Sequence, residues 1–202
     1  MGANAPGIIS PIGKCRIGFQ PLPTFSPGRV GIVAKSGTLS YETVASLTRA
    51  GLGQSLCIGM GGDVVAGTNF VDAFKVFEDD EDTEGMILVG EVGGRAEEEA
   101  AEWVRHYRQR VKNPKLVDAD TPGRSATLTF DRPIAALVAG IYAKPRRVMG
   151  HAGAWAAPGE GNAKTKWNSL EAAGVTMVDH PAKFGRVMSA LLSQNDHYIV
   201  SF

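Results

Sequence analysis

The sequence predicts an α/β domain that is doubly wound around a mainly parallel sheet of five strands. Three observations favour this class. Short apolar runs of strand length recur along the chain, stretches with helical periodicity follow them, and glycine-rich turns stand between the two. Apolar strands that alternate with helices are typical of a parallel sheet covered on both faces.

The predicted strands and helices alternate in chain order. The strands cover residues 30–34, 55–59, 85–90, 134–141 and, more weakly, 175–178. The first helix ends near residue 50, and the others cover about 69–78, 96–111, 164–173 and 182–192. Ser36 suits the N-cap of the first helix and Gly51 suits its end. The acidic residues 97–99 suit the N-terminus of the third helix.

One segment interrupts the alternation. Residues from about 113 to 132 are polar and contain prolines, which predicts a surface insertion between the third helix and the fourth strand. Residues 1–28 are rich in Gly and Pro and are expected to form an extended lead-in. Residues 29–193 then form one domain, and 194–202 form a short tail.

Composition excludes several classes of partner. The 202 residues carry 21 basic and 21 acidic side chains, so no charge excess favours nucleic acid or an anionic membrane. No apolar stretch approaches the roughly 20 residues of a membrane-spanning helix. The first residues lack the pattern of a signal or transit peptide. Cys15 and Cys57 have no metal-ligand spacing and are expected to be ordinary thiols in a reduced compartment, and no metal site is predicted.

A histidine between glycines is the first candidate for chemistry. His151 lies between Gly150 and Gly153, on a loop beyond the carboxyl end of the fourth strand, where open α/β sheets place their sites. Such an imidazole can act as a nucleophile or proton carrier, or it can be an ordinary loop residue. Glu91 ends the third apolar strand, and its loop neighbours that of His151 if the two strands are adjacent. A carboxylate in that position orients an imidazole.

Two further loops should meet at the same edge. Ser36, Gly37 and Thr38 open a helix whose free amides attract an anion, although an ordinary capped helix has the same residues. Gly61 and Gly62 permit close backbone approach to a phosphate or carboxylate, and tight loop packing explains them equally well.

Residues 2 to about 192 resemble the second domain of the α subunit of succinyl-CoA synthetase. The matching motifs, in order, are Asn4-Ala5-Pro6-Gly7-Ile8-Ile9, Lys35-Ser36-Gly37-Thr38-Leu39-Ser40-Tyr41-Glu42, Gly61-Gly62-Asp63, Gly67-Thr68-Asn69-Phe70, Gly90-Glu91-Val92-Gly93-Gly94, Ala96-Glu97-Glu98-Glu99-Ala100-Ala101, Gly150-His151-Ala152-Gly153-Ala154 and Leu170-Glu171-Ala172-Ala173-Gly174-Val175. Several matches of this length in one order are highly specific.

The resemblance implies a flavodoxin-like CoA-ligase domain of an ADP- or GDP-forming succinate–CoA ligase. It implies a phosphohistidine intermediate at His151, held by Glu91. The helix that opens at Ser36 and Gly37 would bind the phosphohistidine, opposite a second helix from a β-type subunit. Tyr41 would belong to the substrate site. The implied phosphate- and substrate-binding set is Ser36, Gly37, Thr38, Tyr41, Gly61, Gly62, Gly150 and Gly153.

The same resemblance implies partners outside this domain. ATP or GTP with Mg would bind the β-type subunit, and CoA would bind a separate domain that has no counterpart in this sequence, so neither is expected to bind here alone. The location implied is the mitochondrial matrix in a eukaryote and the cytoplasm otherwise. Whether the chain also forms a homo-oligomer is left open.

Two other functions stay open: the first because related ligases share the loop of residues 150–154, the second because this sequence departs from the family pattern. Ala34 loses a hydroxyl of the usual Ser-Arg-Ser-Gly stretch, and Val64 and Ala66 replace prolines of the substrate loop. One alternative is a fragment of an ATP-citrate lyase-like or other acyl-CoA ligase. The other is a non-catalytic interaction or regulatory module that retains the fold.

Overall fold

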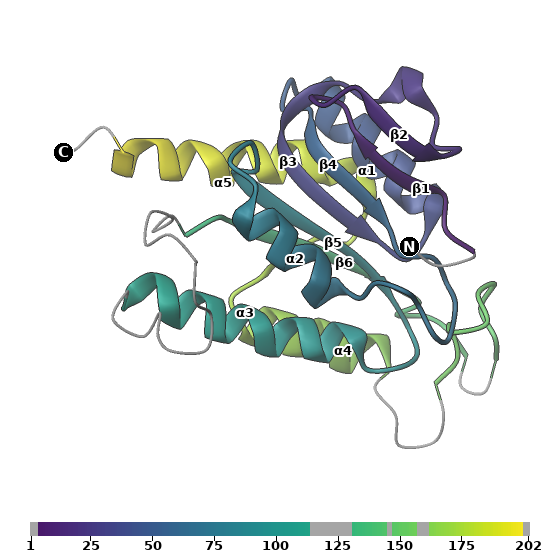
Figure 1. Cartoon of the computed structure of the whole chain (residues 1–202). Coiled ribbons are helices and arrows are strands. Elements are labelled where there is room, and N and C mark those ends of the chain that lie inside the picture. Colours follow the sequence, from purple (N-terminus) through teal and green to yellow (C-terminus); the bar gives the residue numbers. More distant parts are fainter. Residues whose placement is uncertain (1–3, 114–130, 145–146, 157–161, 200–202) are drawn as a thin grey trace.

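The computed structural model describes residues 4–113, 131–144, 147–156 and 162–199, and within them the strands form one sheet (Figure 1). Its order is β2-β1-β4-β3-β5-β6-β7. The strands are β1 (Gly7–Ser10), β2 (Cys15–Gly18), β3 (Pro27–Ala34), β4 (Gln54–Gly59), β5 (Gly85–Glu91), β6 (Ile134–Ala139) and β7 (Thr176–Met177). The helices are α1 (Gly37–Arg49), α2 (Phe70–Asp79), α3 (Ala96–Lys112), α4 (Ala163–Ala172) and α5 (Phe184–Ile199), with short 3₁₀ turns η1 (Leu22–Thr24) and η3 (Pro181–Lys183).

The predicted α/β class and mainly parallel sheet are confirmed. Strands β4, β3, β5, β6 and β7 are mutually parallel. Numbered by their order in the chain, these five strands run 2-1-3-4-5, which is the flavodoxin-like order. The chain leaves β3 toward β4 and later returns to β5 on the other side of β3. The carboxyl ends of β3 and β5 therefore flank the topological switch point, where such sheets bind ligands.

The predicted number of strands was wrong, because the sheet has seven rather than five. Residues 1–28 were expected to be only an extended lead-in, but β1 and β2 form an antiparallel hairpin, and β1 pairs with the edge of β4. Gly7 and Gly18 face each other in this hairpin with positive φ, so closely that a Cβ on either would overlap the opposite backbone. Four-residue strands with glycines at their ends have no sustained alternation, so the pairing was not recognisable locally.

The boundaries at the C-terminal end also differ from the prediction. The last helix, α5, continues to Ile199, so residues 194–199 extend the helix instead of forming a separate tail. Most of the predicted insertion, residues 114–130, lies outside the described residues. Across the described ranges, no helix has both the length and the apolar composition that crossing a bilayer requires.

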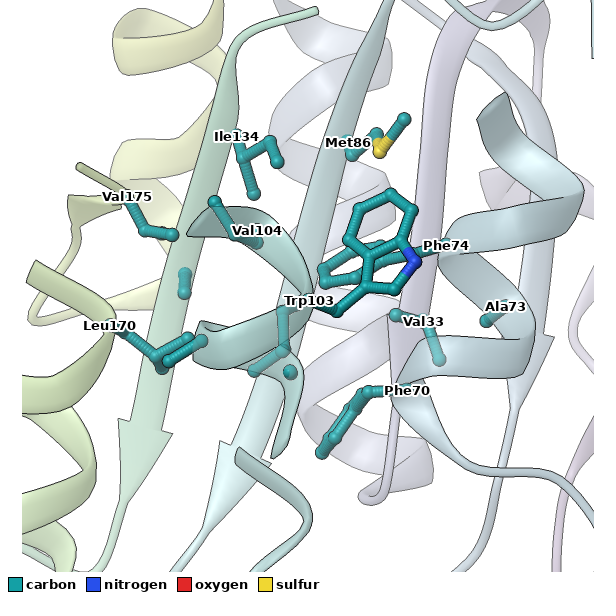
Figure 2. Close-up of a cluster of buried hydrophobic side chains, with 14 of the residues drawn as sticks. Val33, Phe70, Ala73, Phe74, Met86, Trp103, Val104, Ile134, Leu170 and Val175 are labelled. Atoms are coloured by element: carbon teal, nitrogen blue, oxygen red, sulfur yellow. The ribbon is translucent and has the colours of Figure 1, made fainter. Parts of the chain in front are cut away.

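Helices cover both faces of the sheet (Figure 1). One core lies beneath α2, α3 and α4, and a second lies beneath α1 and α5. In the first core, Trp103 stacks on Phe74, with ring centroids 5.2 Å apart (Figure 2). It also stacks on Tyr107, with ring centroids 5.1 Å apart. Each fully buried large apolar side chain contributes about 1.5–3 kcal/mol. The two cores hold the strand ends in place and thereby determine where the following loops begin.

Arg132 anchors the start of β6 after the predicted insertion. The residue is only 6% exposed. Its guanidinium donates to the carbonyls of Phe77 and Glu78 in the last turn of α2, each at 2.6 Å, and to the carbonyl of Asp80 at 3.1 Å. A cation at a helix C-terminus satisfies carbonyls that have no intrahelical partner. The chain therefore re-enters the sheet at a defined point before the loop that carries His151.

Candidate active site

The candidate residues gather at the carboxyl edge of the sheet, around the switch point. Ser36 follows β3, and Glu91 is the last residue of neighbouring β5. His151 lies on the loop after β6, which pairs with β5 on its other side. Three consecutive strands therefore deliver the helix start, the carboxylate and the imidazole to one edge, as strand adjacency requires.

His151 and Glu91 are in direct contact. Nδ1 of His151 lies 2.6 Å from Oε2 of Glu91, within hydrogen-bond distance. An ionised carboxylate can only accept, so the ring N–H at Nδ1 donates while Glu91 is ionised. The imidazole side chain is 28% exposed and the glutamate side chain 8%. Because Nδ1 is engaged, Nε2 is the ring nitrogen that remains to accept an electrophile.

The environment of Glu91 raises the pKa of its carboxyl. Burial raises the pKa of the Glu91 carboxyl above its ordinary value, and this is the largest effect. The charge and hydrogen bond of His151 and the charge of Lys35 lower that pKa, while the negative charge of Glu97 raises it. An adjacent positive charge stabilises the ionised form of such a carboxyl. An imidazole supplies that charge when it is protonated, or when its ring becomes cationic during a reaction.

Glycines let the surrounding loops close on the imidazole. A Cβ built on Gly62 would lie 2.1 Å from Cγ of His151, so the ring packs directly on the glycine backbone. Gly153 donates its N–H to the carbonyl of Gly62 at 3.1 Å, which joins the His151 loop to the loop after β4. Gly93 has φ +97, and a Cβ there would lie 2.0 Å from the carbonyl oxygen of Gly153. Three loops therefore depend on the absence of side chains to hold the ring.

The start of α1 is capped within the chain. Ser36 is the N-cap, and its hydroxyl accepts a hydrogen bond from the N–H of Leu39 at 3.4 Å. Thr38 is exposed, and the Tyr41 hydroxyl lies beside Gly37. Burial, with a smaller contribution from Cys57, raises the pKa of Tyr41. The first-turn amides lie after β3, between the strand that leads to Gly62 and the strand that ends in Glu91.

The remaining predicted glycines do not contact the imidazole in the same way. Gly61 has φ +88 and packs against the backbone of Asn4, in the segment that leads to β1. Gly150 has φ +91, and nothing lies within 4 Å of its Cβ position. A positive φ at both positions favours glycine for the course of the backbone. Their predicted roles in phosphate binding remain predictions.

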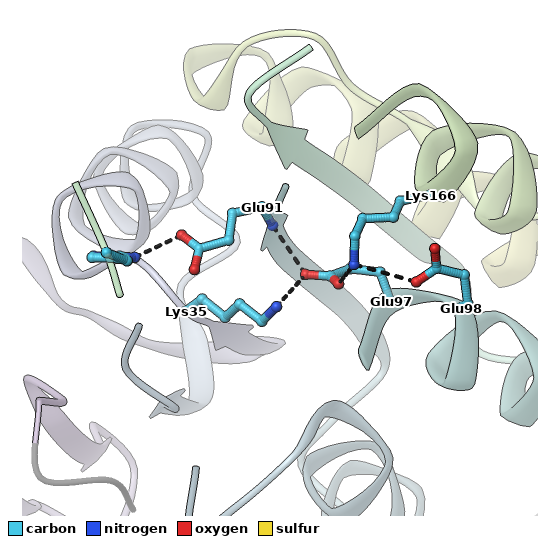
Figure 3. A network of polar contacts seen from close by, with 6 residues as sticks. Lys35, Glu91, Glu97, Glu98 and Lys166 are labelled. Carbon is cyan, nitrogen blue, oxygen red and sulfur yellow. Dashed lines mark hydrogen bonds and ion pairs between the residues drawn. The ribbon is translucent and has the colours of Figure 1, made fainter. Parts of the chain in front are cut away.

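Sequence reasoning missed a buried charge network behind Glu91 (Figure 3). Glu97, at the start of α3, is fully buried and forms ion pairs with Lys35, at 2.8 Å, and with Lys166 of α4. Lys166 is also fully buried, and its ammonium lies 3.2 Å from the carboxylate of Glu98. The acidic residues were attributed only to the N-terminus of a helix. A lysine in the sequence of α4 carries no local signal of burial.

The site described above is separate from a surface groove of about 620 Å³ between α1 and α5. The groove is lined by Ser46, Arg49, Ala50, Ala182, Gly185, Arg186, Ser189, Ala190 and Ser193. None of these is a candidate site residue. Among the residues that the structure describes, no cluster of three or more His, Cys, Asp or Glu side chains could hold a metal ion.

Glu91→Gln is expected to remove the fall in folding stability that Glu91 causes as the pH rises. A carboxyl whose pKa is raised in the folded state contributes stability that is fully present below its unfolded pKa, near 4.5, and that is lost as the pH rises through the folded pKa. The stability of the variant relative to wild type should therefore increase as the pH is raised from about 4 to 7. Urea unfolding at several pH values measures this. A difference that is constant or falls with rising pH would contradict the burial argument.

The sequence comparisons place this chain among CoA ligases. A family model described as CoA-ligase matches residues 33–176. The chain is 42% identical over 192 residues to succinate–CoA ligase [ADP-forming] subunit alpha 2 of Archaeoglobus fulgidus, covering 95% of this chain and 58% of that protein. It is also 42% identical over 186 residues to the mitochondrial subunit alpha-2 of Trichomonas vaginalis, covering 92% and 54%. The chain thus spans little more than half the length of these relatives.

Two solved structures that share the fold are more distant in sequence than these relatives. ATP citrate lyase of Methanosaeta concilii, in complex with (3S)-citryl-CoA, matches with a TM-score of 0.77 at 22% identity, over 96% of this chain and 30% of that one. A dinucleotide-forming acetyl-coenzyme A synthetase of Ca. Korarchaeum cryptofilum matches with a TM-score of 0.62 at 18% identity, over 88% and 33%. At these identities the likeness concerns the fold alone.

Proposed function

Since the chain belongs to the CoA-ligase family, we propose that it is the phosphoryl-carrying domain of an acid–CoA ligase, with His151 as the carrier. The observation that carries this proposal is the contact between Nδ1 of His151 and Glu91, which leaves Nε2 of a partly exposed ring without a partner among the described residues. Succinate is the proposed acid, because the relatives at 42% identity are named succinate–CoA ligases.

Histidine would split one difficult transfer into two easier ones. Nε2 attacks the γ-phosphorus of a nucleoside triphosphate, the bond between that phosphorus and the oxygen of the β-phosphate breaks, and the nucleoside diphosphate leaves. The carboxylate of the acid then attacks the phosphorus, the N–P bond breaks, and an acyl phosphate forms. The sulfur of the CoA thiol then attacks the acyl carbon, the bond from that carbon to the phosphate oxygen breaks, and the thiol proton leaves with the released phosphate, which yields the thioester. Throughout, Glu91 holds the ring by Nδ1 and keeps Nε2 directed outward.

This domain would need partners for the complete reaction. A phosphohistidine carries about two negative charges, and one helix N-terminus such as that of α1 offsets only about 0.3–2 kcal/mol of their cost. We therefore propose that a β-type subunit supplies further stabilisation together with the Mg-nucleotide site, in keeping with the name "subunit alpha" of the relatives. CoA would bind a separate domain. A mitochondrial location applies if the source is a eukaryote, as for the Trichomonas relative.

The test is to map the phosphate. The chain, combined with a β-type subunit and a CoA-binding domain, should incorporate one acid-labile, base-stable phosphate from ATP or GTP, and peptide mapping should place it on His151. Succinate with CoA should discharge the label, and citrate should not. Discharge by citrate alone would favour the lyase-like alternative, whereas no label with any nucleotide would favour a non-catalytic module.

A further inference from the structure

We propose that Glu97 and Lys166 are positioning residues for the His151–Glu91 pair: together they hold the backbone of Glu91 and tie together the helices that follow the two loops carrying that pair. The proposal rests on the proposed phosphoryl-carrier function of His151. It assigns a role to two fully buried charged side chains that do not themselves contact the imidazole.

The first part of the argument is the position of Glu97. Its Oε1 accepts a hydrogen bond from the backbone N–H of Glu91 at 3.0 Å and from the ammonium of Lys35 at 2.8 Å. Its side chain lies flat against Gly90, where a Cβ would come within 2.7 Å of it. The carboxylate thus holds Glu91, the last residue of β5, by its main chain at the point where the strand ends (Figure 3).

The second part is the position of Lys166. It lies on α4, the helix that follows the His151 loop, whereas Glu97 lies on α3, the helix that follows the Glu91 loop. Its ammonium binds Oε2 of Glu97 and lies 3.2 Å from Glu98. This ion pair therefore joins the two segments on which the imidazole and its carboxylate are carried.

The third part is energetic. A buried ion pair gains little net stability, because desolvation of the two charges costs about as much as their attraction returns. An apolar pair of similar size would fill the same space. What the charged pair adds is a fixed orientation of the Glu97 carboxylate, because that carboxylate binds both lysines and the N–H of Glu91. For histidines that ligate metals, loss of the group that orients the ring typically costs about 10- to 100-fold in affinity or activity, and we expect an effect of the same order here.

The test uses two near-isosteric variants, Glu97→Gln and Lys166→Met, in the full chain. Glutamine can still accept from the N–H of Glu91 but no longer pairs with the lysines, and methionine removes the cation. Imidazole ¹⁵N shifts measure which ring nitrogen of His151 carries the proton, without any partner or nucleotide. Each variant should convert the single Nδ1–H form into a mixture, and each should lower the labelling rate about 10- to 100-fold with an unchanged KM for the nucleotide.

The matched control is Arg110→Met, which breaks an ion pair of 3.0 Å with Glu78 between α3 and α2. It should lower the Tm without changing the ¹⁵N signals or the labelling rate. If either single variant does not fold, the double variant Glu97→Gln/Lys166→Met, which leaves no unpaired lysine at position 166, decides the matter. Wild-type ¹⁵N signals and labelling within about twofold of wild type would overturn the positioning role even if His151 is phosphorylated. If the ¹⁵N signals of the variants are altered but no nucleotide labels even the wild-type chain, the proposed function is overturned instead.

Discussion

Replacing His151 by alanine is expected to abolish phosphoryl transfer. Without the imidazole there is no nitrogen to accept the phosphorus, and the transfer can no longer be split into two steps. Removal of a covalent carrier lowers turnover by at least about 1,000-fold. Two quantities are measured with the chain, its partners and an excess of nucleotide. The first is the incorporation of acid-labile phosphate, and the second is the formation of the thioester.

The control for this experiment is a histidine outside the site. His106 is exposed on α3, so His106→Ala should label like the wild type. Because the side chain of His151 is 28% exposed, its removal should leave no large cavity, and the Tm of the His151→Ala variant should stay within a few degrees of wild type. An alanine variant that still accumulates acid-labile phosphate would exclude His151 as the carrier.

Gly62→Ala is expected to slow phosphoryl transfer by displacing the imidazole of His151. The new Cβ would lie 2.1 Å from Cγ and 2.4 Å from Nδ1 of His151, so the ring has to leave its place beside Glu91. A shift of about 1 Å at a reacting group can cost about 100-fold in rate. We expect the labelling rate to fall by about that factor. Unlike Gly61 beside it, Gly62 has no positive φ, so alanine can adopt its backbone conformation.

Gly94→Ala separates this steric effect from the general loss of a glycine. Gly94 is on the loop after β5 with φ +59, and nothing lies within 4 Å of its Cβ position. Its alanine variant should lose about 1–2 kcal/mol of stability from the left-handed backbone and retain its labelling rate. Equal labelling by Gly62→Ala and wild type would show that the ring tolerates displacement and that its contact with Glu91 is dispensable.

Local patterns were sufficient for most of the fold. The five parallel strands and five helices follow from apolar runs, helical periodicity and the Ser36 cap, all of which act within a few residues. The β1–β2 hairpin was missed because its strands are only four residues long, and because β1 joins the sheet through β4, 48 residues away between Ile9 and Cys57. Long-range pairing leaves no trace in a short, glycine-flanked segment.

The candidate site, like the fold, contains residues that local patterns identify and residues that they do not. Glu91 and His151 stood out because a lone carboxylate and a glycine-flanked imidazole follow apolar strands, and strand adjacency then brings them to 2.6 Å. Glu97 and Lys166 did not stand out. They lie 69 residues apart, and an acid at a helix start or a lysine within a helix is ordinarily solvated.

The sequence by itself determined the class of the fold, the order of its five parallel strands and main helices, and the two side chains on which the proposed chemistry depends, because caps, periodicity and apolar runs are local properties. Only the tertiary structure decided which strand lies beside which, that Gly62 supports the imidazole, and that a buried lysine and glutamate stand behind the strand end of Glu91. These features arise from packing between segments distant in the chain, where burial and charge pairing depend on every neighbour at once.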